Sequence, residues 1–193
     1  MNAPLYPKRL AVSRNNQEGQ PSRAAFHSNN ATITQGMFVG AVGGLAGTLV
    51  MDLVLMGAFM ATGLPAITCF SIVGDTVARF CSLLGVGTAG GVPLGVATHY
   101  LIGPLVGAIF GAAVTQVEAL RVDTLKKSVI LAVLYVEILS QPILATAPIL
   151  LKMTAHETLQ WYGVSFVMHF ILAVVLGVIV SYGLRFATTG NQR

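Results

Sequence analysis

Four long apolar runs dominate this chain, and each is long enough to cross a lipid bilayer as a helix. They cover residues 37–61, 92–117, 128–151 and 163–184, and as α-helices they would measure roughly 33 to 39 Å. The hydrocarbon core of a bilayer is about 30 Å thick, so each run spans it with some tilt. Only 9% of the residues are charged. The sequence therefore predicts an all-α polytopic membrane helix bundle, a single domain over residues 36–187.

The segment 64–90 is ambiguous between crossing the membrane and lying at its surface. It opens with Gly63-Leu64-Pro65, carries Asp75 and Arg79 four positions apart, and ends in a glycine-rich stretch. An acid and a base at this spacing share one helical face and can neutralise each other. We interpret the segment as re-entrant or interfacial, with a fifth span as the alternative.

The distribution of basic residues favours four spans. Cytoplasmic loops are enriched in Lys and Arg. With four spans and 64–90 kept outside, nine basic residues face the cytoplasm and two face outward, whereas five spans give about six against five. The sequence thus predicts a multi-pass protein of a prokaryotic cytoplasmic membrane with both termini cytoplasmic.

Polar segments precede and follow the predicted bundle. Residues 1–35 form a basic tail without helical or strand periodicity, and residues 188–193 form a short C-terminal tail. No short apolar region near the start resembles a cleavable signal peptide, so the first span is expected to act as an uncleaved anchor. We expect the N-terminal tail to dock on a partner subunit through its apolar residues, Leu5, Tyr6, Leu10 and Phe26.

Small residues recur at four-residue intervals in three of the runs. Such spacing lets helix backbones approach closely, which is how membrane helices associate without a hydrophobic driving force. The glycines expected to serve this packing are Gly40, Gly44, Gly103, Gly107, Gly111 and Gly177.

Four ionisable residues lie inside the apolar runs: Asp52, His99, Glu137 and His169. A charge at the centre of a membrane helix costs about 2.5–3.5 kcal/mol on insertion scales, so such residues usually face the bundle interior and have partners. Four-span topology places all four at similar depth. Three interpretations stay open: hydrogen bonds between helices, a proton or ion pathway, or a ligand set for a divalent metal.

Motifs for soluble-type chemistry are missing from the sequence. It contains no haem, nucleotide or zinc motif, so the cofactor is unknown, and catalytic activity is uncertain and not expected. Cys69 and Cys81 belong to no metal or disulfide pattern. The basic residues are scattered over the tail, loops and chain ends, which indicates no nucleic-acid partner.

One stretch resembles a known family. Gly43-Gly44, Thr48, Met51 and Gly63-Leu64-Pro65, followed by His99 with the glycines after it, is similar to the small YagU-like family of uncharacterised prokaryotic inner-membrane proteins, over residues 36–117. The resemblance implies about four spans in a prokaryotic cytoplasmic membrane. The long polar tail departs from the family pattern.

Two functions follow as hypotheses. The first is an accessory or structural subunit of a larger membrane complex, packed through its glycine-rich helix faces against other subunits and surrounded by the lipid bilayer. The alternative is a small proton, ion or metal transporter or channel that uses Asp52, His99, Glu137 and His169.

Overall fold

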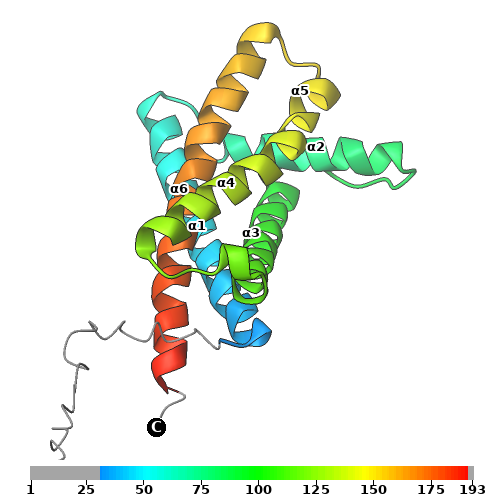
Figure 1. Ribbon diagram of the computed structural model, residues 1–193. Coiled ribbons are helices and arrows are strands. Elements are labelled where there is room, and N and C mark those ends of the chain that lie inside the picture. Colours follow the sequence, from blue (N-terminus) through cyan, green and yellow to red (C-terminus); the bar gives the residue numbers. More distant parts are fainter. Residues whose placement is uncertain (1–30, 191–193) are drawn as a thin grey trace, which may run out of the picture.

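The computed structural model describes residues 31–190, which form a helical bundle without strands (Figure 1). The predicted N-terminal tail and its anchor residues lie almost entirely outside this range. The helices are α1 (Ile33–Ala61), α2 (Thr68–Leu83), α3 (Val92–Gln116), the short 3-10 helix η1 (Glu118–Leu120), α4 (Leu125–Leu144), α5 (Thr146–Leu151) and α6 (Ala155–Gly190).

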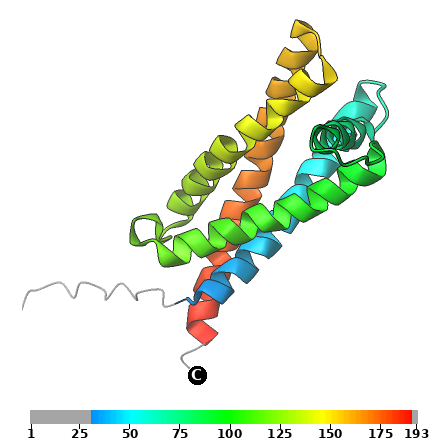
Figure 2. The ribbon, with the colours of Figure 1, turned by 90° about the vertical axis from the view of Figure 1, so that its right-hand side faces the viewer.

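Four segments are long and apolar enough to cross a membrane, as predicted. They are α1, α3, the α4–α5 segment and α6. The segment that was ambiguous in the sequence forms α2, which has only 16 residues and lies across one end of the bundle rather than along it (Figures 1 and 2). The described chain therefore has four candidate spans, and the beginning of α1 and the end of α6 lie at the same end of the bundle (Figure 2).

The first and last helices, α1 and α6, are longer than predicted. Helix α1 begins at Ile33, because the Thr32 hydroxyl accepts a hydrogen bond from the Gln35 backbone N–H and the Gln35 side chain returns one to the Thr32 N–H. This capping box satisfies two of the N–H groups that a helix start leaves unpaired. Helix α6 covers the predicted loop from Ala155 onward and continues to Gly190, into the predicted C-terminal tail.

The predicted third span is interrupted between α4 and α5. Pro148 has no N–H to donate to the carbonyl of Leu144, four residues earlier. The indole N–H of Trp161 on α6 donates to that Leu144 carbonyl at 3.0 Å. A side chain from a neighbouring helix thus satisfies the acceptor that the proline leaves free, as membrane helices require.

Helices α1 and α3 touch through their backbones. At five of the six glycines of this contact a Cβ atom would collide with a carbonyl oxygen of the opposite helix, and at Gly103 it would collide with the Thr48 hydroxyl, so only glycine fits. This geometry directs Cα hydrogens at carbonyl oxygens, a weak attraction worth about 0.5–1 kcal/mol each. Successive antiparallel rungs are formed by Gly36 with Gly111, Gly40 with Gly107, and Gly44 with Gly103.

Helix α6 packs between α1 and α4 and joins the bundle into one body. Gly47 of α1 lies against the backbone and side chain of Leu172. On its other side, Gly177 lies against Val129 of α4, and the buried Ser128 hydroxyl donates to the Gly177 carbonyl at 2.7 Å. The predicted packing role of Gly177 is thereby assigned to the α4–α6 contact.

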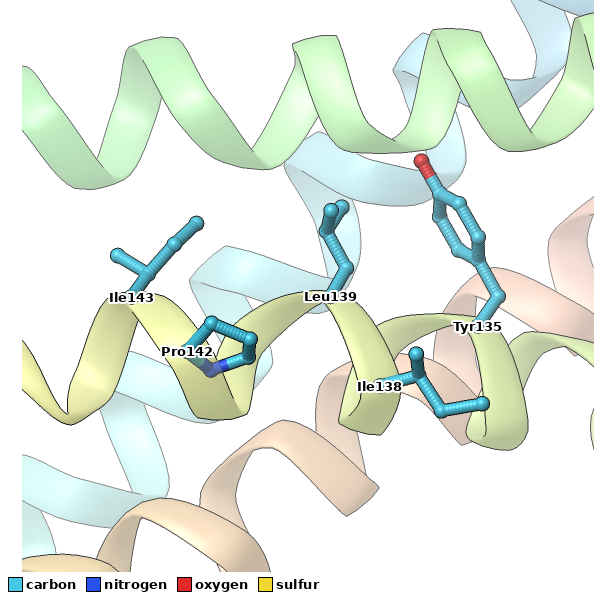
Figure 3. A pocket seen from close by; sticks show the side chains of 5 residues that line it. All are labelled: Tyr135, Ile138, Leu139, Pro142 and Ile143. Carbon is cyan, nitrogen blue, oxygen red and sulfur yellow. The ribbon is translucent and has the colours of Figure 1, made fainter.

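Helices α3 and α4 diverge toward the end of the bundle where α2 and α5 lie (Figure 2). Near the middle of α4 they are bridged by Tyr135, whose hydroxyl donates to the Val106 carbonyl at 3.1 Å and whose ring lies against Phe110. Beyond this bridge, α4 faces α3 across an apolar groove (Figure 3).

The backbone contact between α1 and α3 predicts opposite effects for two Gly→Ala substitutions on the same helix. Gly40→Ala places a methyl group on the Gly107 carbonyl, and we expect it to lower the free energy of unfolding by about 1–3 kcal/mol. Gly57 has no atom within 4 Å of its would-be Cβ. Gly57→Ala should be neutral or stabilising by up to about 1 kcal/mol, because alanine favours helix. Unfolding curves in detergent measure both, and equal effects would contradict the contact.

Candidate intramembrane polar site

The glycine rungs of α1 and α3 end in a pair of ionisable side chains. Along α1, the four-residue stripe continues from Gly44 through Thr48 to Asp52, and the side chain of Thr48 lies against Gly103. Asp52 is only 2% exposed. Close packing of the two backbones therefore buries this carboxylate inside the bundle, where it faces α3.

Asp52 and His99 form a direct contact between the two helices. The Nδ1 atom of His99 lies 3.0 Å from the Oδ1 atom of Asp52, and an Nδ1–H group in this position donates to the carboxylate. The other oxygen, Oδ2, is buried and has no hydrogen-bond partner in the described part of the chain. Only one of the two Asp52 carboxylate oxygens therefore has a hydrogen-bond partner among the described residues.

Side chains from four other positions lie near this pair. The ring of Phe70 on α2 meets the His99 imidazole edge to face, with centroids 5.3 Å apart. Cys69 is buried beside them, and burial, with a smaller contribution from the Asp52 charge, raises the pKa of its thiol to about 12. Tyr100 lies near the same carboxylate, and His169 on α6 is close enough to His99 for their charges to interact.

The other two predicted residues are bonded within their own helices. The Nδ1–H of His169 donates to the Ser165 carbonyl at 2.7 Å. The Nε2 amide of Gln141 donates to Oε2 of Glu137 at 2.9 Å, and Oε1 of Glu137 is buried without a partner in the described residues.

The structure brings Asp52 and His99 together and leaves Glu137 apart. Tyr135 reaches α3, and Glu137, two residues later on α4, is rotated about 200° around the helix axis. Glu137 therefore points away from α3 and from Asp52. Within residues 31–190, no group of three or more His, Cys, Asp or Glu side chains is placed to hold a metal ion.

An acid paired with a histidine suits a hydrogen bond inside a membrane. The described Lys and Arg residues lie in loops or near helix ends, and the Asp52 carboxylate is bonded to the His99 imidazole. In chemical terms, the arrangement links α1 to α3 through a hydrogen bond between an imidazole and a carboxyl group.

Sequence reasoning missed two polar contacts that shape this end of the bundle. Asp75 does not pair with Arg79, as its spacing suggested, but accepts a hydrogen bond from the Gly91 N–H at 2.7 Å. A carboxylate here complements the N-terminus of α3. Asp75 lies 16 residues before Gly91, the N-cap residue of α3, so no short-range sequence pattern indicated this bond. For the bond between Trp161 and Leu144, the only signal in the sequence was Pro148, which leaves the Leu144 carbonyl without a helical donor.

Fold and site together define a polytopic α-helical membrane protein whose helices are joined by glycine contacts and one buried polar pair. No protein-family model, curated protein or solved structure matches the chain. The resemblance to the YagU-like family stays a prediction.

A double-mutant cycle tests the Asp52–His99 bond. Asp52→Asn and His99→Gln each leave a buried partner poorly satisfied, and each should lower the free energy of unfolding by about 1–3 kcal/mol. The double variant should lose less than the sum, with a coupling energy near 0.6–1.7 kcal/mol, the range for membrane hydrogen bonds.

The cycle of Asp52→Asn with His169→Gln is the control, because His169 bonds to its own helix. It should be additive within about 0.5 kcal/mol. Additivity in the Asp52–His99 cycle as well would show that the observed contact contributes nothing to stability.

Proposed function

We propose that this protein is an accessory subunit of a larger integral membrane complex. One observation carries the proposal: the side of α4 that points away from the rest of the bundle combines apolar side chains with intramembrane polar groups. We call it the outer α4 face and define it by Ile130, Leu134, Glu137 and Gln141.

The outer α4 face has the spacing of a helix-packing seam. Its four positions are separated by four, three and four residues, which keeps them on one side of a helix. Ile130 and Leu134 are 47% and 54% exposed. Beside them lies an acid with one unsatisfied oxygen, Glu137 Oε1, whose neighbour Gln141 comes from the same helix. A polar pair on the lipid-facing side of a helix is costly, and a helix from another subunit would shield it from the lipid.

The six predicted packing glycines do not provide this interface. All lie in contacts between helices of the same chain, so a partner must bind elsewhere, and the outer α4 face is available. The transporter alternative has less support, because it requires a continuous polar path. Asp52 and His99 are bonded to each other, whereas Glu137 and His169 bond within their own helices.

The proposed location is a prokaryotic cytoplasmic membrane with both chain ends cytoplasmic. Helices α1, α3, α4 and α6 alternate in direction, and the connection between α3 and α4 lies at the same end of the bundle as the start of α1 (Figure 2). Arg121 lies in this connection, and Lys126 and Lys127 lie in the first turn of α4. An excess of basic residues at this end supports a cytoplasmic assignment.

Extraction in mild detergent followed by size and subunit analysis tests the proposal. The wild-type chain should co-purify with at least one different membrane subunit. Leu134→Trp, on the outer α4 face, should reduce this co-purification. Leu105→Trp is the matched control, because Leu105 on α3 is 52% exposed against 54% for Leu134. A monodisperse monomer, or an oligomer of this chain alone, would exclude the accessory role.

Cysteine labelling of intact cells tests the orientation. In a Cys81→Ser background, a cysteine at Thr124 should be protected from an impermeant thiol reagent, and one at Thr158 should react. Cys69 should stay silent, because it is buried and its pKa is raised to about 12, so it is protonated at neutral pH. Labelling at Thr124 from outside would reverse the proposed orientation.

A further inference from the structure

The groove between α3 and α4 is apolar and lies within a membrane-spanning segment. Tyr135, Ile138, Leu139, Pro142 and Ile143 line it, and its volume is about 520 Å³ (Figure 3). The polar group of Tyr135 is already bonded to the Val106 carbonyl. The groove therefore presents hydrocarbon to its occupant and fits an apolar chain better than a polar ligand.

A second, polar pocket lies near the end of the α4–α5 segment. It has a volume of about 460 Å³ and is formed by α2, the loop before α3 and the end of α5. Ile143 in the groove and Leu151 in the polar pocket are eight residues apart, about 12 Å along a helix. Residues of the α4–α5 segment thus line both sites, Ile143 in the groove and Leu151 in the polar pocket.

The polar pocket carries a cation without a partner. Arg79 lines it and makes no ion pair or hydrogen bond within the described chain. Asp75, four residues earlier, is engaged by the Gly91 N–H at 2.7 Å and lies 3.5 Å from the Ser71 hydroxyl. Lys152 follows Leu151 directly. A guanidinium with free donors at the end of a membrane bundle is suited to a phosphate group.

We propose that the groove and the polar pocket together bind one phospholipid, with an acyl chain along α4 and the phosphate at Arg79. The surrounding bilayer supplies this ligand, and no partner protein is required. The site does not depend on the accessory role proposed above, because the residues that line it differ from those of the outer α4 face.

Native mass spectrometry of the full-length, delipidated protein tests this site with three added probes. These are dioleoyl phosphatidylglycerol, dioleoylglycerol, which lacks the phosphate, and inorganic phosphate, which lacks the chains. One phosphatidylglycerol per chain should bind in preference to either of the others. Arg79→Gln should weaken its binding about fivefold, the effect of removing one cation near a lipid headgroup. Lys126→Gln, at the opposite end of the bundle, should not.

The groove is tested by Leu139→Trp, which fills it and should abolish the bound lipid. Leu101→Trp is its control, because Leu101 is an exposed leucine of α3 outside the groove. Arg79 is on the surface, so its variant remains informative even if Leu139→Trp fails to fold. Equal lipid binding by wild type, Arg79→Gln and Leu139→Trp, or no preference over dioleoylglycerol, would overturn the proposal.

Discussion

The rest of the structure depends on the direct contact between the backbones of α1 and α3. Membrane helices gain no hydrophobic free energy by leaving lipid for each other, so they associate through packing and polar contacts. Glycines at Gly40 and Gly107 allow an approach that any side chain would prevent. This closeness buries Asp52 against His99. The same device recurs where Gly74 and Gly95 join α2 to α3.

Much of this arrangement was predictable from sequence, because the length of an apolar run and the spacing of its glycines can be read from each segment alone. Apolar runs gave the four long helices, and four-residue glycine spacing gave the packing stripes. The rotation of each helix about its axis was not predictable, since it depends on which neighbouring helix packs against each row of small residues. That is why Glu137 was grouped with Asp52 and His99 by depth, although its side chain points away from α3. The Asp75–Gly91 bond was missed for a similar reason, because it joins residues brought together only by the fold.

The two sides of α4 suggest different surroundings for this chain. Toward α3 it presents an apolar groove, and the polar pocket at the end of α5 contains Arg79, which forms no ion pair within the described residues; both features suit lipid. On the outer α4 face it presents an acid and an amide next to an exposed isoleucine and leucine, which suits another membrane helix. An open groove and an unsatisfied polar face are both costly for an isolated bundle in lipid, and both are consistent with a protein that works in contact with other molecules.

Solid-state NMR of the protein in lipid bilayers, with ¹³C-labelled glycine, tests the central contact most directly. The structure predicts carbonyl-to-Cα correlations between Gly40 and Gly107 and between Gly44 and Gly103, because the carbonyl oxygens of Gly107 and Gly103 lie where Gly40 and Gly44 would carry a Cβ. Correlations confined to glycines of the same helix would contradict the account, since α1 and α3 would then be separated by side chains.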